Sequence, residues 1–334
     1  MTRICGGIVL IALSLGACSR EEAPSNEAPD SGAPSAPSEN DAGISDERDA
    51  NIPDADRVDL CPDGFPRGTP GNARLVAKLA SPPEGIAVCP NGDVFVSIPD
   101  EAKILRVPLD GNAPELWATL AGRQPLGMDC LDGTLFVVDF RSNDAAVLRI
   151  AAKGAQAEAL PPIEGGTGYS ALNGIVAIKG RGIYVSDASN TPFGRIVLFT
   201  ETAPGKYVAS VAKSGIAFPN GLAFDSKAET LDVALTLQSQ VLAFTADADA
   251  GLGTGKVTWS GVPLVDSIDG IAIDEHKALY VAHNPQGYVG RTSDDSKLAT
   301  MKEPKSLAFR GGVLLITGAE GLYGKPLGIC GVER

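Results

Sequence analysis

The sequence predicts an all-β protein, a six-bladed β-propeller with a central channel. The chain of 334 residues contains 39 glycines and only 5% aromatic residues, a composition typical of many short strands joined by tight turns. One pattern also recurs six times after residue 61: a turn, a short apolar run, a polar turn, and a run of β-branched and aromatic residues. The copies are about 36 to 49 residues apart, the length of a four-stranded propeller blade.

Each copy carries a small residue near the start of its first apolar run. The copies begin at Pro83, Pro125, Leu172, Pro219, Ile268 and Pro304, and their small anchor residues are Gly85, Gly127, Gly174, Gly221, Gly270 and Ser306. We expect each copy to continue into a third strand, as at 104–107 and 240–244. A two-sheet sandwich is the competing all-β fold, but it does not explain six copies in register.

The N-terminal 60 residues are expected to lie outside the propeller. Arg3, an apolar core at 8–13 and the sequence Leu15-Gly16-Ala17-Cys18 predict a lipoprotein signal over 1–18. The last four residues resemble a bacterial lipobox, in which the cysteine, here Cys18, is lipidated. An ordinary signal peptide cut near Ala17 is the alternative.

Residues 19–60 predict a disordered tether. They contain 12 acidic and 3 basic residues, with many Ser and Pro, and cannot bury enough apolar surface to fold. An acidic interaction tail is the alternative. We expect an exported protein, lipid-anchored to the bacterial cell envelope, with the outer membrane favoured. The propeller, 61–334, would face the periplasm or the cell surface, and membrane contact is expected only through the anchor.

Four cysteines remain for the propeller: Cys61, Cys89, Cys130 and Cys330. They allow three pairings. Because the two ends of a propeller meet in one blade, a Cys61–Cys330 disulfide is favoured. Cys89 and Cys130 lie near equivalent positions in the first two repeats, so they either pair with each other or stay as buried thiols.

The charge of the chain argues against a nucleic-acid partner. The formal net charge is −13, and no cluster of Lys and Arg is available to neutralise phosphates. We therefore expect a small-molecule ligand, no nucleic acid, and a monomer.

The residues that precede the anchors predict a metal site. They are Glu84, Leu126, Asn173, Asn220, Asp269 and Lys305. Equivalent positions on the inner strands would form a ring at one height of the channel, and the four residues Glu84, Asn173, Asn220 and Asp269 offer oxygen ligands. Such a set suits Ca²⁺, with Mg²⁺, Mn²⁺ or Zn²⁺ as substitutes. The alternative is that they are turn residues, since Asn-Gly and Asp-Gly are common turn dipeptides.

The segments P-E-G-I-A-V, F-P-N-G-L-A-F and S-I-D-G-I-A-I-D resemble the SMP-30/gluconolactonase/LRE-like family and the related paraoxonase-type lactonases. The resemblance covers most of 73–330. It implies a six-bladed propeller with calcium in its channel, with Glu84, Asn220 and Asp269 as ligands. It also implies that Asn173 binds metal or faces substrate, and it supports the Cys61–Cys330 disulfide.

The chain departs from the paraoxonase pattern at several positions. Gly85 and Gly174 stand where acidic residues would bind a second calcium, so that ion is not predicted. Leu126 and Phe140 replace a histidine pair, and Asn284 replaces a further pocket histidine. We expect Asn284, with Asn173, to contact the substrate.

These residues predict a calcium-dependent hydrolase of lactones or related esters. Asp269 is the expected general base that activates a water, His283 is a second candidate for base or substrate contact, and Glu84 is expected to be a ligand only. Asp139 and Asp187 are interpreted as strand-end caps. The leading alternative is a non-catalytic calcium-containing propeller that binds a ligand or protein at the cell envelope. A condensing propeller of the strictosidine-synthase kind is less favoured.

Overall fold

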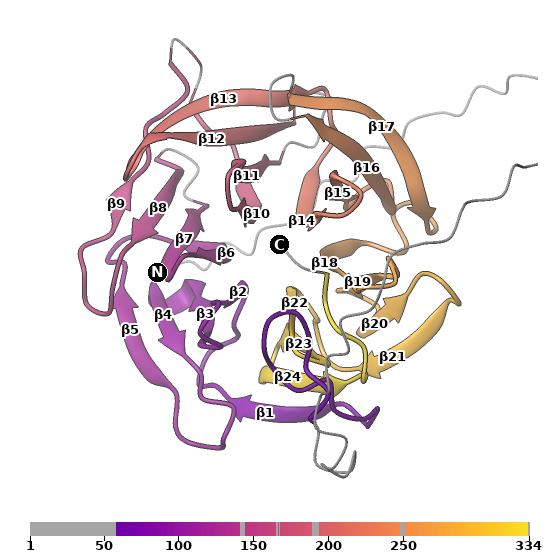
Figure 1. Cartoon of the computed structure of the whole chain (residues 1–334). Coiled ribbons are helices and arrows are strands. Elements are labelled where there is room, and N and C mark those ends of the chain that lie inside the picture. Colours follow the sequence, from indigo (N-terminus) through magenta and orange to yellow (C-terminus); the bar gives the residue numbers. More distant parts are fainter. Residues whose placement is uncertain are drawn as a thin grey trace, which may run out of the picture. The chain divides into compact units, whose positions relative to one another are not determined.

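Six four-stranded antiparallel sheets surround a central axis in the computed structural model (Figure 1). The structure describes residues 58–140, 144–164, 166, 168–188, 194–247 and 251–332. The predicted signal, the lipidation site Cys18 and almost all of the predicted tether lie outside this part of the chain. The prediction of an all-β six-bladed propeller is confirmed.

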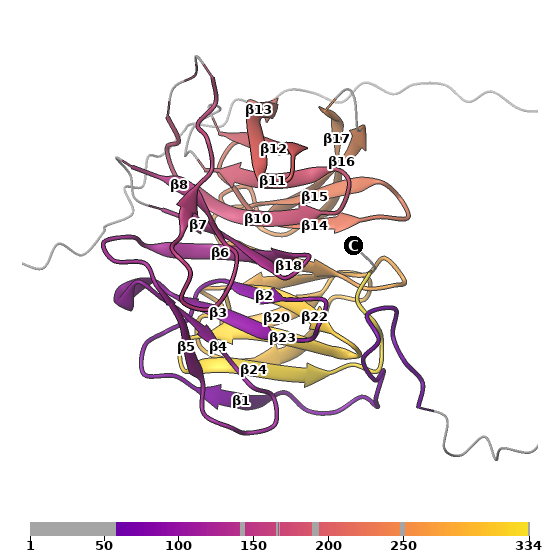
Figure 2. The same cartoon turned by 60° about the vertical axis from the view of Figure 1, so that its left-hand side comes forward.

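The strands occupy four concentric positions in the blades, seen from the side in Figure 2. The inner strands are β2 (Ile86–Val88), β6 (Pro125–Leu131), β10 (Leu172–Ile178), β14 (Pro219–Asp225), β18 (Ile268–Ile273) and β22 (Leu307–Arg310). The second strands are β3 (Val94–Ile98), β7 (Thr134–Asp139), β11 (Gly182–Asp187), β15 (Thr230–Leu235), β19 (Leu279–His283) and β23 (Val313–Gly318).

The third strands are β4 (Lys103–Arg106), β8 (Ala146–Ile150), β12 (Arg195–Ala203), β16 (Gln240–Asp247), β20 (Tyr288–Arg291) and β24 (Gly321–Pro326). The outer strands are β5 (Glu115–Thr119), β9 (Glu158–Ala159), β13 (Lys206–Ser214), β17 (Gly251–Ser260), β21 (Ser296–Thr300) and β1 (Arg74–Lys78). The sixth blade takes its outer strand from the other end of the chain, since β1 pairs with β24.

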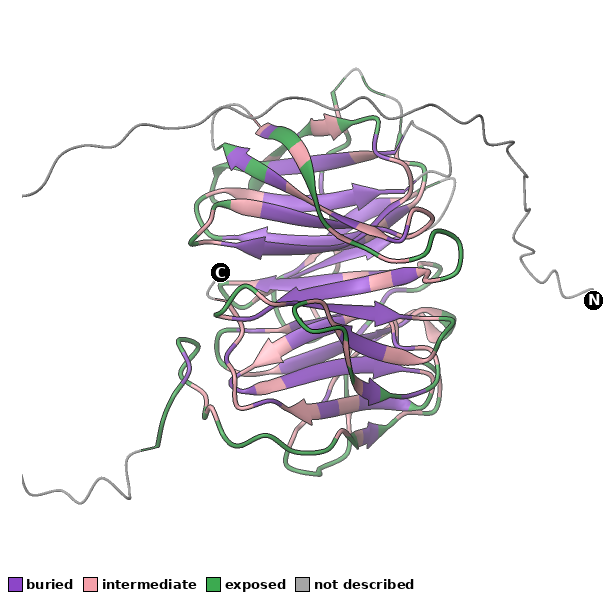
Figure 3. Cartoon of the chain, turned by 90° about the vertical axis from the view of Figure 1, so that its right-hand side faces the viewer, coloured by how far each residue is buried: buried purple, intermediate pink, exposed green. Residues whose placement is uncertain are grey.

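The hydrophobic core is divided into six clusters, each between two neighbouring blades. The first and second apolar runs of two neighbouring repeats both contribute side chains to such a cluster. Burial is therefore densest in the strands and least in the connecting loops (Figure 3). Removing this apolar surface from water is the main force that holds one blade to the next.

Two disulfides reinforce the closed circle: the favoured Cys61–Cys330 pairing is confirmed, and of the two alternatives left open for Cys89 and Cys130 the disulfide is the one present. Cys61 bonds to Cys330 across a sequence separation of 269, with the Cα atoms 5.5 Å apart. Cys89 bonds to Cys130, with the Cα atoms 5.0 Å apart, and joins the inner-strand regions of the first two blades. Near the first disulfide, the Arg67 guanidinium pairs with Glu275, whose carboxylate also accepts a hydrogen bond from the Cys330 amide at 3.0 Å.

In the part of the chain that the structure describes, the helix is a single short turn, Pro99–Glu101. No helix in these residues is long and apolar enough to cross a membrane.

Candidate functional site

A local irregularity of the inner strands forms the ring of predicted site residues. In β6, β10, β14 and β18 the register against the second strand shifts across the anchor glycine and the residue before it. Such bulges redirect a side chain out of the regular alternation of a strand. They place Leu126, Asn173, Asn220 and Asp269 at one register position.

The anchor glycines are explained by the close approach of neighbouring inner strands. A Cβ atom on Gly85 would lie 2.1 Å from the carbonyl oxygen of Leu126, and one on Gly221 would lie 2.5 Å from that of Asp269. Both distances are far inside van der Waals contact, so only glycine fits there. Each ring residue is therefore held against the next blade through its own backbone.

Hydroxyl groups on the second strands fasten the ring, a feature that we did not predict. The Ser97 hydroxyl accepts a hydrogen bond from the Gly85 amide at 2.7 Å and donates one to the Leu126 carbonyl of the next blade at 2.7 Å. The Thr317 hydroxyl bonds to the Glu84 carbonyl at 2.7 Å in the same way. Ser97 and Thr317 are fully buried, so these bonds fix the spacing between blades.

Asp269 lies at the centre of a polar cluster. Its Oδ2 accepts a hydrogen bond from Asn284 Nδ2 at 3.1 Å, and its carboxylate also interacts with the Asn220 side chain. Asn220 Nδ2 in turn donates to Thr236 Oγ1 at 3.0 Å. The structure therefore brings together Asp269, Asn220 and Asn284 as predicted, and adds Thr236, which follows β15 as Asn284 follows β19.

The electrostatics of this cluster are dominated by burial and by two carboxylates close together. Burial, and then the charge of Glu84, raise the pKa of Asp269 to about 7. Burial also raises the pKa of Glu84, against the opposing effect of the Lys305 ammonium. One proton is therefore readily held by the pair near neutral pH.

Lys305, the sixth ring residue, contributes a positive charge. Its Nζ pairs with Glu84 Oε2, and both side chains are half-buried. Burial acts to lower the pKa of Lys305, but Glu84 and Asp269 outweigh it and the pKa is raised. The side chain is accordingly an ammonium ion.

The ring does not fit a calcium ion in this arrangement. Its carboxylate and amide oxygens are of the kind that calcium prefers. However, the Lys305 ammonium is bonded to one of the two carboxylates, so an added cation would meet a like charge. Among the described residues, no three His, Cys, Asp or Glu side chains gather as a metal site, and the ring itself supplies only two carboxylates beside the amides of Asn173 and Asn220.

Two predicted site residues remain, Asn173 and His283. Asn173 occupies the ring position of β10 and is half-buried. His283 is buried, stacks on Tyr288 with ring centroids 4.2 Å apart, and packs edge-on against Trp259 at 5.6 Å. Burial lowers the pKa of His283. Its contacts are thus in the packing between two blades, and its assignment as a base stays a prediction.

Asp139 and Asp187 are confirmed as strand-end caps. Asp139 Oδ1 accepts from the Gln124 amide at 2.7 Å, and Asp187 Oδ1 accepts from the Ala171 amide at 2.8 Å. Arginines pair with the other oxygen of each carboxylate. His283 occupies the equivalent position of β19, opposite Ile268.

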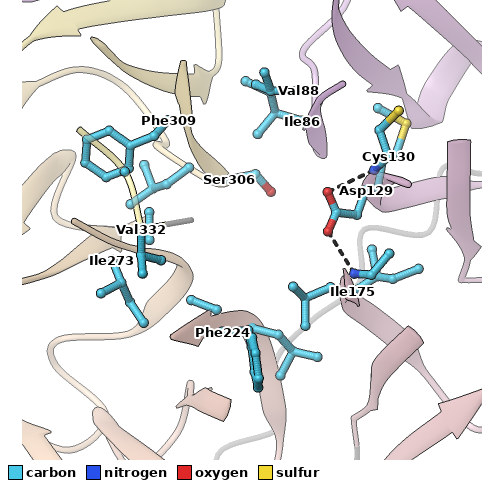
Figure 4. A pocket seen from close by; sticks show the side chains of 18 of the residues that line it. Ile86, Val88, Asp129, Cys130, Ile175, Phe224, Ile273, Ser306, Phe309 and Val332 are labelled. Atoms are coloured by element: carbon cyan, nitrogen blue, oxygen red, sulfur yellow. Dashed lines mark hydrogen bonds between the residues drawn. The ribbon is translucent and has the colours of Figure 1, made fainter. Parts of the chain in front are cut away.

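An apolar cavity lies in the other half of the channel, beyond the anchor glycines. It has a volume of about 420 Å³ and is lined mainly by apolar side chains of the inner strands (Figure 4). Its buried carboxylate, Asp129, accepts hydrogen bonds from the Cys130 and Ala177 amides. None of the six ring side chains lines this cavity, so it is separate from the Asp269 cluster.

Comparison with known proteins agrees with the motifs. The family model of the SMP-30/gluconolactonase/LRE-like region matches residues 174–317, which is shorter than the 73–330 over which we noted the resemblance. No curated protein matches the chain.

Solved structures that share this fold are distant in sequence. A gluconolactonase from Xanthomonas campestris is 20% identical, with a TM-score of 0.64 over 76% of this chain and 89% of that one. A calcium-binding protein, regucalcin from Agrobacterium tumefaciens, is 16% identical, with a TM-score of 0.62 over 80% and 96%. A virginiamycin B lyase from Staphylococcus aureus is 16% identical, with a TM-score of 0.53 over 76% and 97%.

At these identities the likeness establishes the fold, and a lyase among the neighbours shows that one propeller carries different chemistries. The family match is the more specific finding, because it spans three of the six ring positions, Asn220, Asp269 and Lys305. The resemblance noted in the sequence is thus confirmed: the chain is a six-bladed propeller in which residues 174–317 match the model of the SMP-30/gluconolactonase/LRE-like region.

Proposed function

We propose that the ring hydrolyses lactones or related esters of small molecules. The observation that carries the proposal is the Asp269 carboxylate, half-buried between Asn284 and Asn220 with a pKa raised to about 7 by burial and by Glu84. A carboxylate with such a pKa is an effective proton acceptor near neutral pH. The match to a family that includes gluconolactonases supports this reaction class.

The chemistry assigned to Asp269 is general-base catalysis. Asp269 takes a proton from a water as the water oxygen bonds to the carbonyl carbon of the substrate. The bond from that carbon to the ring or ester oxygen then breaks, and the proton passes from Asp269 to the leaving oxygen. The products are a carboxylic acid and an alcohol, which are a single hydroxy acid when the substrate is a lactone.

The neighbouring amides would orient the reactants. The Asn284 amide holds Asp269 Oδ2, and the Asn220 side chain also bonds to this carboxylate, so the two amides fix its orientation toward the attacking water. We propose Asn173, from β10 of the third blade, as a contact for the substrate. His283 would need to leave its stack on Tyr288 to reach the ring, and we therefore assign the base role to Asp269 first.

Calcium dependence was expected from the sequence, and the regucalcin neighbour is described as calcium-binding. Calcium in the ring would require the Lys305 ammonium to leave Glu84. The roles proposed for Asp269, Asn284 and Asn173 do not depend on a metal ion.

The experiment that tests the proposal is a panel of lactones and esters assayed by pH-stat. It would include a sugar lactone, a homoserine-type lactone and an aryl ester. We expect turnover of at least one class, and we expect Asp269→Asn to lower kcat/KM by about 100-fold or more, the usual effect of losing a general base. Asp132→Asn, a surface carboxylate paired with Lys179, is the matched control. Turnover in Asp269→Asn within threefold of the unsubstituted chain would refute the proposed role.

Export and lipid anchoring at Cys18 are also proposed, so that hydrolysis would take place at the cell envelope. Mass spectrometry of the protein from membranes would detect a lipidated Cys18. A Cys18→Ala variant should then appear in the soluble fraction.

A second candidate function, ligand binding without turnover, is favoured by the separate apolar cavity. Its inner-strand side chains, among them Ile175, Phe224 and Ile273, would suit an apolar group (Figure 4). Binding of an apolar fluorescent probe that Ile175→Trp blocks, in a chain that hydrolyses none of the panel, would favour this function instead.

A further inference from the structure

Lys305 is the ring residue whose charge differs from all the others. The other five positions hold two carboxylic acids, two amides and a leucine. Lys305 lies two residues before β22, and its side chain reaches the Glu84 carboxylate, which belongs to the next blade around the ring. The ammonium therefore lies among the oxygen atoms that the sequence predicted to surround a metal ion.

The backbone fixes Lys305 at this place. Its amide donates to the Thr317 carbonyl at 2.9 Å, and its carbonyl accepts from the Gly270 amide at 2.7 Å. The Glu84 amide is likewise bonded to the Ser97 carbonyl, at 3.0 Å. Both partners of the ion pair thus start from rigid positions on adjacent blades, and the pair is a built part of the ring.

The two side chains also remain open to the channel. The Lys305 side chain is 20% exposed and that of Glu84 18% exposed, so neither is sealed inside the protein. An ammonium has three hydrogen-bond donors. One is used by Glu84, which leaves others that can point to an oxygen atom of a bound molecule.

We propose that the Lys305 ammonium is the resident cation of the ring and takes the place of calcium. The charge balance supports this: one positive charge against the two carboxylates leaves little net negative charge for a divalent ion to neutralise. The ammonium is covalently attached, so a chelator cannot remove it. The ring of this chain therefore binds calcium weakly or not at all.

The role toward the substrate rests on the proposed hydrolysis. There, the ammonium faces the carbonyl oxygen and stabilises the negative charge that develops on it when water attacks. Lys305 would thus supply the positive charge, and Asp269 would supply the base.

Calorimetric titration of the full chain with CaCl2 tests the proposal without any substrate. We expect no saturable binding by the unsubstituted chain after chelator treatment. We expect Lys305→Ser, which removes the ammonium and opens space between Glu84 and Asp269, to bind calcium at least tenfold more tightly and to gain a calcium-dependent rise in Tm. The double variant Lys305→Ser with Asp269→Asn should lose that gain.

Lys302→Ser is the matched control, because Lys302 is an exposed lysine three residues away whose loss changes the net charge equally. It should bind calcium no better than the unsubstituted chain. If Lys305→Ser does not fold, Lys305→Gln is judged by the same criterion. Calcium affinity of the unsubstituted chain within tenfold of the variant, or no gain in either variant, overturns the proposal.

Activity measurements then separate this inference from the proposed function. Turnover that is unchanged by EDTA and falls at least tenfold in Lys305→Ser supports the catalytic part of the inference. A chain that hydrolyses nothing, but whose Lys305→Ser variant gains calcium binding, supports the resident cation and overturns the proposed function alone.

Discussion

At the scale of single residues, the buried hydroxyls on the second strands have the clearest structural role. Ser97 satisfies both a backbone amide of its own blade and a backbone carbonyl of the next. A buried polar group that loses its partner is costly, since it has given up water without a replacement.

Ser97→Ala should therefore destabilise the propeller. The substitution leaves the Gly85 amide and the Leu126 carbonyl without this partner, so we expect a loss of about 1–3 kcal/mol in the free energy of unfolding. Urea unfolding followed by fluorescence measures it. Ser97→Thr keeps the hydroxyl, as Thr317 does in the sixth blade, and should lose less. Equal stability of the alanine variant and the unsubstituted chain would show that the bonds are dispensable.

The sequence predicted the positions of the ring residues where the repeat pattern marks them. Asp269 and Asn220 were identified because each precedes an anchor glycine, and the bulges at those glycines place them as expected. Lys305 held the same position, but a long flexible side chain has many directions open to it. Only the packing shows that it reaches Glu84, across the boundary between the last and the first blade.

At the scale of the strand, β15 contains a carboxylate with an unusual environment. Asp232 is buried, and burial first, then the nearby Asp225, raise its pKa to about 7. In the unfolded chain the same group titrates near its ordinary value of 3.8. The folded state therefore loses stability relative to the unfolded state as the pH rises from about 4 to about 7.

Asp232→Asn should remove this pH dependence. At pH 8 the variant should be more stable than the unsubstituted chain by about 1–4 kcal/mol, the free energy of a shift of one to three pKa units. Below about pH 3, where Asp232 is protonated in both states, the difference should vanish or reverse slightly. Denaturant unfolding at several pH values measures it, with the exposed Asp132→Asn as control. If the free energies of unfolding of Asp232→Asn and of the unsubstituted chain changed in parallel with pH, the raised pKa of Asp232 would be contradicted.

Strand positions were largely predictable, whereas the details of pairing were not. Continuous apolar runs located the inner and second strands, because strands buried on both faces require them. The bulges, by contrast, depend on how closely neighbouring inner strands approach. Three second strands place Ser97, Ser186 and Thr317 at one position, a regularity in the repeats that could have revealed the hydroxyl bonds.

At the scale of the whole molecule, stability depends on closing the circle of blades. The Cys61–Cys330 disulfide joins segments 269 residues apart, while Cys89–Cys130 spans only 41. In the chain-entropy account, a longer loop restricts the unfolded chain more.

Replacing both cysteines of the first pair by serine should therefore cost more than replacing both of the second. We expect the double variant Cys61→Ser/Cys330→Ser to lose about 1–2 kcal/mol more than Cys89→Ser/Cys130→Ser, from the logarithm of loop length. Denaturant unfolding under oxidising conditions compares them. A larger loss in the second pair would indicate that local packing at the first two blades outweighs chain entropy.

The use of β1 as the outer strand of the last blade has a further consequence during synthesis. Residues 74–78 leave the ribosome early, yet their partner β24 is completed only near the end of the chain. Until then the early strand has exposed backbone groups, as does β24 in any molecule that has lost it. Two copies of the chain that meet at this stage could exchange these strands and form a domain-swapped dimer. A chaperone that covers 74–78 until translation ends would favour the single-chain circle.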